Sequence, residues 1–302
     1  MTAHPHFGEM LALATALVWA SAVILFKKSG ETASPLGLNL FKNLLAFLLV
    51  LPTMAVMRVE PLRAAPPGDY ALLLLSGVLG IGIADTLFFK SLNLLGAARS
   101  AVVDCLYSPV IILLSMLWLG ERITAVQAAG VALIVSAVLA LGGEKGTVRI
   151  TRRQLAAGIA LGALSMAAMG VGIVMIKPLL ERSPILWAVE VRFAGAGAFL
   201  LLVLACHPGR RAVLGSLLHS RGWKFMLPGS FLGAYVAILL WIGGMKYATA
   251  SVASALNQTS NLFIFLFAAL FLKERITRPK LVGIVLGVLG VLCVILDGSR
   301  GG

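Results

Sequence analysis

Two aspartates, Asp85 and Asp104, stand inside apolar stretches of the sequence, and each follows three apolar residues. A carboxylate in apolar surroundings needs water, a cation or a proton beside it, and such residues mark ion and proton pathways in membranes. Each aspartate is therefore a candidate for proton coupling or for the counter-ion of a cationic substrate. For Asp85 the alternative is a structural ion pair with Lys42 or Lys90.

Asp104 belongs to a polar stripe that recurs later in the chain. Residues at positions i, i+3, i+4 and i+7 share one face of a helix, and the first stripe consists of Ala101, Asp104, Cys105 and Ser108. A displacement of 153 residues gives a second stripe of Ser254, Asn257, Gln258 and Asn261. We expect the polar residues of both stripes to line one cavity and bind substrate there. Hydrogen bonding between helices is the alternative.

Four aromatic residues lie inside apolar runs rather than at their ends, namely Trp19, Tyr107, Tyr235 and Trp241. An aromatic face can attract a cation or stack on an organic group. These residues are therefore further candidates for contact with substrate. Packing between helices is the alternative interpretation for each of them.

Basic residues also recur inside the apolar stretches, 150 residues apart. Lys27 matches Lys177 and Lys42 matches Arg192, with Glu190 two residues before Arg192. Residues two apart on a helix point to different faces, so Glu190 does not simply neutralise Arg192. The recurrence suggests a role in the scaffold. These side chains could also bind a carboxylate-bearing substrate, reach the lipid headgroups or pair with acids on neighbouring helices.

The other reactive residues form no recognised catalytic or metal-binding pattern. The three cysteines are far apart, the four histidines lie outside the apolar runs, and no G-x-S-x-G, H-E-x-x-H or G-x-x-x-x-G-K-[ST] motif occurs. We therefore expect no cofactor, no bound metal, no ATP hydrolysis and no enzyme activity. Two intramembrane aspartates leave an intramembrane enzyme as the alternative from another class, but the segment before Asp85 lacks the G-x-G-D arrangement of intramembrane aspartyl proteases.

The elements that must position these residues are membrane-spanning helices. The sequence is 60% hydrophobic and 12% charged, whereas a soluble domain carries about 25% charged residues. Most of the 25 Lys and Arg residues lie in short clusters between apolar runs, which favours lipid headgroups over nucleic acid as their partners. We expect an integral multi-pass protein of the bacterial inner membrane.

Ten apolar runs are long enough to cross a bilayer, for which about 20 helical residues suffice. They predict an all-α membrane protein with spans at 9–27, 36–57, 70–92, 97–119, 125–143, 155–180, 185–206, 224–246, 250–272 and 279–297. Residues 119–124 (LGERIT) return as 272–277 (LKERIT), which indicates an internal duplication. We predict two five-helix repeats, 1–147 and 148–302, that form one transport domain. Because five is odd, the second repeat starts from the opposite side, which makes a five-plus-five inverted repeat.

These features resemble the drug/metabolite transporter superfamily and, within it, the EamA-type permeases. The resemblance covers nearly the whole chain and rests on Trp19, on Lys42 and Arg192 early in helices two and seven, and on the motifs G-E-R at 120–122 and K-E-R at 273–275. Ser108-Pro109 in the fourth helix also fits the family, whereas Leu262 occupies the matching position in the ninth. Proline therefore predicts a bend in only one of these two helices.

The resemblance implies a secondary transporter of small organic metabolites, such as amino acids or cationic drugs. It would work by alternating access, in the direction of export or sometimes uptake. An ion gradient, with protons coupled through Asp85 or Asp104, or the gradient of the solute itself would supply the energy. A flippase for a lipid-linked small molecule is the alternative within transport. Since one chain holds both repeats, we expect a functional monomer.

Two arguments disagree about the side of the membrane on which the termini lie. The family resemblance implies cytoplasmic termini. The basic clusters at 145–153, 210–224 and 273–280, however, lie on the side opposite to the termini in the ten-span topology. The positive-inside rule then places the termini outside, and we predict external termini on this second argument.

Overall fold

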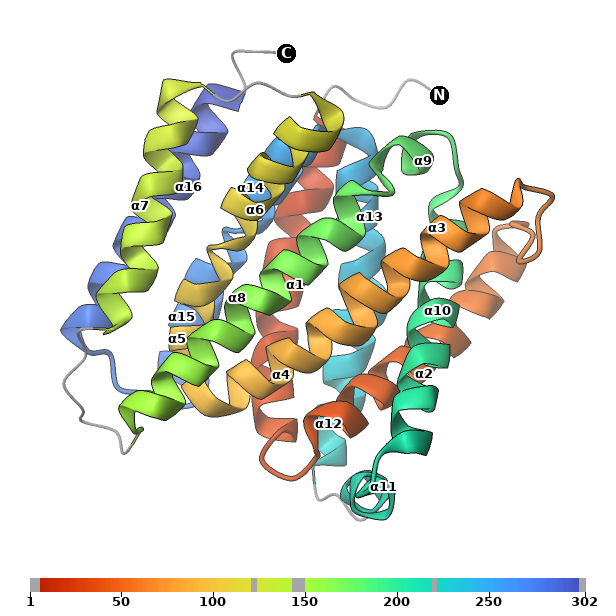
Figure 1. Cartoon of the computed structure of the whole chain (residues 1–302), viewed down its shortest axis with the longest axis horizontal. Helices are drawn as coiled ribbons and strands as arrows, with labels where there is room; N and C mark the ends of the chain where they lie inside the picture. The colour runs from red at the N-terminus through yellow and green to blue at the C-terminus, as the bar shows by residue number, and fades with distance from the viewer. Residues whose placement is uncertain (1–5, 121–123, 143–149, 219–221, 299–302) are drawn as a thin grey trace.

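The computed structural model of the chain consists of helices joined by short connections (Figure 1). It describes residues 6–120, 124–142, 150–218 and 222–298, and these ranges contain no β-strand. The prediction of an all-α protein is therefore confirmed for the described ranges. The first copy of the repeated E-R-I motif, at 121–123, lies outside them.

The helices follow one another with few interruptions. The first half of the chain contains α1 (Phe7–Ser29), α2 (Pro35–Val56), α3 (Pro67–Gly77), the π-helical turn η1 (Val78–Ile83), α4 (Ala84–Leu95), α5 (Ala97–Asp104), α6 (Tyr107–Leu114), η2 (Ser115–Leu119) and α7 (Ala125–Gly142). The second half contains α8 (Arg152–Val174), α9 (Lys177–Glu181), α10 (Ile185–Cys206), α11 (Arg210–Leu218), α12 (Trp223–Ser230), η3 (Phe231–Val236), α13 (Ala237–Tyr247), α14 (Ala250–Asn257), α15 (Ser260–Phe271) and α16 (Arg278–Gly298).

Among the described residues, seven helical stretches are long and apolar enough to cross a membrane. They are Phe7–Ser29, Pro35–Val56, Pro67–Leu95, Ala97–Trp118, Arg152–Val174, Ile185–Cys206 and Trp223–Tyr247, with shorter apolar helices at Ala125–Ala137 and Ser260–Phe271. The total of ten spans stays a prediction. The span predicted at 155–180 differs from the structure, because α8 ends at Val174. Pro178 cannot donate the backbone hydrogen bond that would continue this helix.

Element boundaries repeat along the chain at the displacements seen in the sequence. Both ends of α10 lie 150 residues after those of α2. Both ends of α14 lie 153 residues after those of α5, and both ends of η3 lie 153 residues after those of η1. The duplication therefore extends to local structure, including the two π-helical turns.

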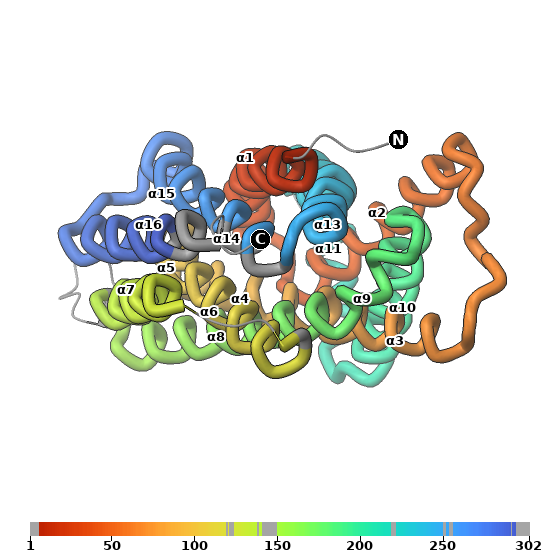
Figure 2. Tube along the Cα trace, turned by 90° about the horizontal axis from the view of Figure 1, so that it is seen from above, coloured from red at the N-terminus to blue at the C-terminus, as the bar shows by residue number. Residues whose placement is uncertain are grey.

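The two halves of the chain interlock. α1 packs against α12, α13, α14 and α15, while α8 packs against α4, α6 and η1. Figure 2 shows α1 beside α13, and α7 beside α16 at one end of the molecule. Where α8 crosses η1 the backbones touch, since a Cβ added to Gly172 would lie 2.8 Å from the Gly80 Cα. Glycine permits such a close approach of two membrane helices.

Candidate functional site

A cavity lies between the two halves of the chain. Its empty volume is ≈ 740 Å³, including the open space at its mouth. The first half contributes residues of α1, α2, η1, α4, α5 and α6, and the second contributes residues of α8, α10, η3, α13, α14 and α15. Corresponding elements of the two halves therefore face one common space.

Most of the residues singled out in the sequence line this cavity. They are Trp19, Lys42, Asp85, Asp104, Tyr107, Arg192, Trp241, Asn257, Gln258 and Asn261. The tertiary structure thus brings the polar stripes, the intramembrane charges and three of the aromatic residues together. The side chain of Ser254, the first residue of the second stripe, lies outside the described residues.

Three predicted site residues do not line the cavity. Ser108 is buried one position beyond Tyr107, and its Oγ makes no hydrogen bond within the described ranges. The stripe is interrupted there because the helix breaks between α5 and α6. The Tyr235 hydroxyl lies instead 2.6 Å from Thr53 Oγ1 on α2. Glu190 is buried, and neither of its carboxylate oxygens has a hydrogen-bond partner among the described residues.

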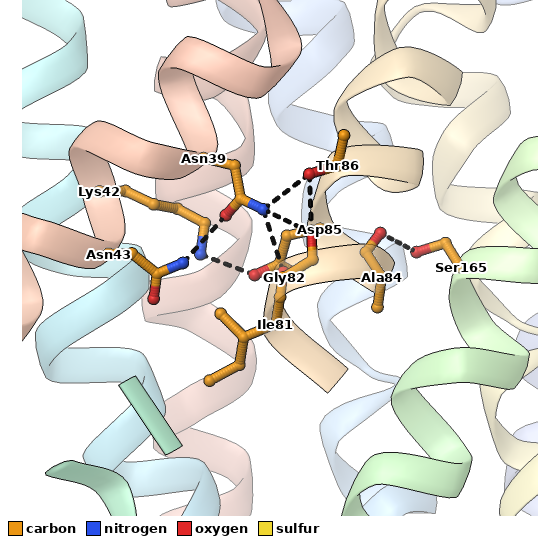
Figure 3. A network of polar contacts seen from close by, with 9 residues as sticks. All are labelled: Asn39, Lys42, Asn43, Ile81, Gly82, Ala84, Asp85, Thr86 and Ser165. Carbon is orange, nitrogen blue, oxygen red and sulfur yellow. Dashed lines mark hydrogen bonds and ion pairs between the residues drawn. The ribbon is translucent and has the colours of Figure 1, made fainter. Parts of the chain in front are cut away.

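Lys42 and Asp85 form a buried ion pair in the cavity wall (Figure 3). Lys42 Nζ lies 2.6 Å from Asp85 Oδ2, and the two side chains are only 4% and 8% exposed. Of the two structural partners considered for Asp85, Lys42 is therefore the one that pairs, while Lys90 is exposed. Each of these buried charges is compensated by the other, and losing either one would leave an unpaired ion in low-dielectric surroundings.

Asn39 holds the backbone next to this ion pair, and the sequence reasoning missed it. Its Nδ2 donates to the backbone oxygens of Ile81 and Gly82, at 3.0 Å each, and to Thr86 Oγ1 at 2.9 Å (Figure 3). The side-chain amide thus satisfies carbonyl groups of the π-helical turn η1. An asparagine inside an apolar run, one turn before Lys42, was the available signal.

Arg192 is the second buried cation of the cavity, and it has no ion-pair partner within the described ranges. Its side chain is among the most buried in the protein, Nε donates to Ser76 Oγ at 3.0 Å, and the guanidinium carbon lies 5.6 Å from the centre of the Trp241 ring. Both terminal nitrogens are buried and make no hydrogen bond to a described residue. A charged donor without an acceptor is costly to bury. The terminal N–H groups of Arg192 can therefore still bind an acceptor that enters the cavity.

The polar stripes lie at two helix breaks. α5 ends at Asp104 and α6 begins at Tyr107, whereas α14 ends at Asn257 and α15 begins at Ser260. The Asp104 side chain is buried and lines the cavity. Its carboxylate forms no ion pair or hydrogen bond within the described part of the chain, unlike the carboxylate of Asp85.

Gln258 connects the two breaks across the halves. Its Nε2 donates to the backbone oxygen of Asp104 at 2.9 Å and to that of Cys105 at 3.3 Å. Pro109 lacks the N–H that would bond to Cys105 in a continuous helix. Gln258 therefore satisfies an acceptor that the proline leaves free. Hydrogen bonding between helices, the alternative interpretation of the stripes, is thus realised for this residue.

The second break occurs without a proline, which the sequence did not predict. Leu262 stands where the first half has Pro109, yet the helix is interrupted at 258–259. Thr259 Oγ1 donates to the backbone oxygen of Leu256 at 2.8 Å, and Asn261 Nδ2 donates to Gln258 Oε1 at 2.6 Å. Polar side chains that bond locally compete with the regular helical pattern, which accounts for the interruption.

Apolar and weakly polar side chains complete the cavity wall. Sequence reasoning missed Thr15, Phe88, Met166 and Met169, which all line it. The Phe88 ring packs against Trp19 with ring centres 5.8 Å apart. Such residues are ordinary in an apolar span, so their types and spacing carried no signal.

The other matched basic pair has a structural role in both halves. Lys27 Nζ donates to the backbone oxygens of Leu92 and Asn93 at the end of α4, at 3.2 and 3.4 Å. Lys177 Nζ donates to those of Met245 and Ala248 at the end of α13, at 2.6 and 3.0 Å. Cations bind favourably to the free carbonyl groups at a helix C-terminus. These contacts agree with the scaffold role that the recurrence suggested.

Glu274 of the repeated motif makes the complementary contact at a helix N-terminus. Its carboxylate oxygens accept hydrogen bonds from the backbone N–H groups of Ala97 and Ala98, at 2.8 and 3.2 Å. The preceding Gly96 has a φ of 81°, and a Cβ there would lie 3.0 Å from Glu274 Oε1. The motif in the second half thus caps α5 in the first half.

Known proteins resemble this chain over most of its length. The model of the EamA-like transporter family matches residues 6–143 and again 156–296. An uncharacterized transporter of Archaeoglobus fulgidus is 24% identical over 289 residues, which are 95% of this chain and 97% of that protein. Protein PecM of Dickeya dadantii is 25% identical over 267 residues, which are 85% of this chain and 84% of PecM.

Two further comparisons extend this picture. The uncharacterized transporter YetK of Bacillus subtilis is 29% identical over 151 residues, and the match spans 50% of this chain and 44% of YetK. A protein crystal structure with 18% sequence identity has a TM-score of 0.70 and covers 97% of this chain and 98% of its own; this likeness concerns the fold. Together with the seven spans, the relatives confirm an integral multi-pass protein of the bacterial plasma membrane.

Proposed function

Because the chain belongs to the EamA-like transporter family, as its sequence resemblance indicated, we propose that it moves a small organic solute across the membrane by alternating access. The observation that carries this proposal is the cavity, which corresponding elements of both halves line with charged, amide and aromatic side chains. Secondary transporters commonly bind substrate between two repeats in this way. The walls would then rock around the bound solute.

The proposal includes ten membrane spans in a five-plus-five inverted repeat, with residues 1–147 and 148–302 as the repeats of one transport domain. The family model matches once inside each of these ranges. In Figure 1, α1 descends from the upper end of the molecule, whereas α8 ascends from the lower end. Opposite directions of the first helices are what an odd number of crossings in each repeat would produce. The external position of the termini stays a prediction.

Asp104 is the first candidate for proton coupling in this scheme. Its carboxylate is buried, borders the cavity and has no partner among the described residues, whereas Lys42 holds Asp85 at 2.6 Å. Loading a proton on one side and releasing it on the other would couple solute movement to a proton gradient. The remaining substrate contacts would come from Trp19, Tyr107, Trp241, Asn257 and Asn261.

The proposed direction is export, and the proposed solutes are metabolites such as amino acids or cationic drugs. We propose that a monomer moves them without a cofactor or an enzymatic step.

The test uses purified protein in liposomes with an imposed proton gradient. Counterflow of a pool of amino acids, organic acids and organic amines is followed for wild type and for Asp104→Asn. The matched control is Glu60→Gln, which changes an exposed carboxylate between α2 and α3.

We expect at least one pooled solute to move, and the gradient to accelerate it in wild type and in Glu60→Gln but not in Asp104→Asn. Movement that ignores both the gradient and Asp104→Asn would leave a facilitator and remove the coupling role of Asp104. No movement of any pooled solute, with correctly folded and inserted protein, would contradict the proposed function itself.

A further inference from the structure

The guanidinium of Arg192 has two terminal nitrogens whose N–H groups no described residue accepts. Its side chain is 1% exposed and borders the cavity, and only Nε is used, in the bond to Ser76 Oγ. Both terminal nitrogens are buried without a partner within the described ranges. A buried cation of this kind is normally compensated by an anion. The cavity therefore offers a place for a negative group.

The other half of the molecule indicates what kind of group belongs there. Lys42, the residue matched to Arg192, is neutralised by Asp85 at 2.6 Å. The position matched to Asp85, 153 residues later, is Ile238, which also lines the cavity. Trp241 lies on the same face of α13 one turn further, and Arg192 lies 5.6 Å from its ring. The second half thus has the cation of the pair without the carboxylate.

From this contrast we infer that Arg192 binds a carboxylate of the transported solute, in the place that a protein carboxylate occupies in the first half. This inference rests on the proposed function and specifies its substrate class. The solute is an organic monocarboxylate, because the Lys42–Asp85 pair is neutral and leaves Arg192 as the uncompensated cation among the described cavity residues. Asp104, the carboxylate of the same cavity that has no partner among these residues, is neutral in this scheme while it carries the coupling proton.

The geometry around Arg192 suits a flat, two-oxygen anion. A guanidinium presents parallel donors that match both oxygens of a carboxylate. The Trp241 ring packs near the guanidinium, and Gly80 leaves room beside it, since a Cβ there would lie 3.1 Å from Nη2. The neighbouring Trp19, Phe88 and Met166 are apolar or aromatic. They would contact the organic body of the solute.

Binding to the purified full-length protein tests this inference. The probes are monocarboxylates from acetate to 3-phenylpropanoate, each compared with its amide and its amine, and also inorganic phosphate. Because Trp19 and Trp241 line the cavity, tryptophan fluorescence reports binding. The variants are Arg192→Gln, Ile238→Asp and, as the uncharged control of similar size, Ile238→Asn. Ile238→Asp introduces a carboxylate at the position matched to Asp85.

We expect at least one carboxylate to bind more tightly than its amide and amine. Arg192→Gln should weaken that binding on the order of 30-fold and leave the amide unaffected, as for removal of one partner of a buried charge pair. Ile238→Asp should weaken it similarly by competing for Arg192, and Ile238→Asn should not. The Ile238 variants keep the test decisive if Arg192→Gln fails to fold.

Several results would overturn the inference. One is that the amide, the amine or phosphate binds as tightly as the carboxylate or more tightly. Another is that no carboxylate binds up to its solubility limit. The third is that Ile238→Asp does not change the affinity for the carboxylate. The liposome assay separates this failure from that of the proposed function. Movement of amines alone, without amino acids or organic acids, would reject the carboxylate and keep the transporter, whereas no movement of any solute would reject both.

Discussion

The two halves of this protein share their scaffold contacts and differ in their cavity contacts. Lys27 and Lys177 bind the ends of corresponding helices, α4 and α13, in the same way. Lys42 and Arg192 also occupy matched positions, but Lys42 has a carboxylate partner at 2.6 Å and Arg192 has none within the described ranges. Contacts that hold each repeat together recur, because both copies must fold. Contacts in the shared cavity need to occur only once and are free to diverge.

A similar contrast is found at the helix breaks. Pro109 accompanies the break in the first half, and polar side chains accompany it in the second. The matched residues Cys105 and Gln258 differ as well. Gln258 donates to two backbone oxygens of the first half, whereas Cys105 Sγ donates to the Ala101 backbone oxygen and accepts a weak bond from Asn261 Nδ2 at 3.4 Å. The same backbone geometry is therefore maintained by different side chains.

The largest effect should come from breaking the ion pair that only the first half possesses. Asp85→Asn leaves Lys42 as an unpaired buried cation, and we expect the free energy of unfolding in mixed micelles to fall by about 3 kcal/mol. Arg192→Gln, at the position matched to Lys42 in the second half, should alter it by about 1 kcal/mol or less, since no ion pair is lost. Equal losses in the two variants would show that Arg192 is compensated like Lys42.

The next largest difference in stability should come from glycines at the points where two helices cross closely. Gly172→Ala places a Cβ 2.8 Å from the Gly80 backbone, whereas Gly243→Ala, where α13 crosses α1, meets only the end of the Leu11 side chain at 2.8 Å. The end of a side chain can shift more easily than a backbone, so Gly172→Ala should cost about 2 kcal/mol and Gly243→Ala clearly less. Thermal unfolding in detergent measures both, and the reverse order would show that α8 and η1 can move apart.

The contact between the two breaks should give an intermediate effect. Gln258→Leu leaves the Asp104 and Cys105 carbonyl groups without their donor, at a cost of about 1.5 kcal/mol. Cys105→Ala, at the matched position, removes two weak sulfur hydrogen bonds, one to Ala101 and one from Asn261, and should cost less. The same unfolding assay measures both variants. An unchanged stability of Gln258→Leu would mean that water donates to the two carbonyl groups in place of the glutamine.

The smallest losses of stability should also be the most similar between the two halves. Lys27→Gln and Lys177→Gln each remove a cation from a helix C-terminus, worth about 0.5–1 kcal/mol. Both lysines make this contact in the same way, and the additional Lys177–Glu181 pair at 3.3 Å adds little because Glu181 is 60% exposed. The two losses should therefore agree closely when unfolding is measured under one set of conditions. A large difference between them would contradict the view that the scaffold contacts of the halves are equivalent.

Local patterns in the sequence were sufficient to predict much of the fold. Apolar runs of sufficient length indicated the helices, and the repeated residues at 150 and 153 positions reappear as repeated element boundaries. The polar stripes indicated Asp104, Asn257 and Asn261 as cavity residues, because a polar side chain in an apolar run needs a reason to be there. Phe88 and Met166 gave no such signal, and the break at 258–259 had no proline to announce it.

Composition, hydropathy and repeated residues were enough to predict a helical, duplicated membrane protein with a small set of charged residues inside its spans. The partners of those charges became known only from the packing of the helices. Asp85 pairs with Lys42 and not with Lys90. Arg192 and Asp104 border the cavity without ion-pair partners among the described residues. Hydropathy and helical period are local properties of the chain. Compensation of a buried charge depends on side chains that lie far apart in sequence and meet only when the halves interlock.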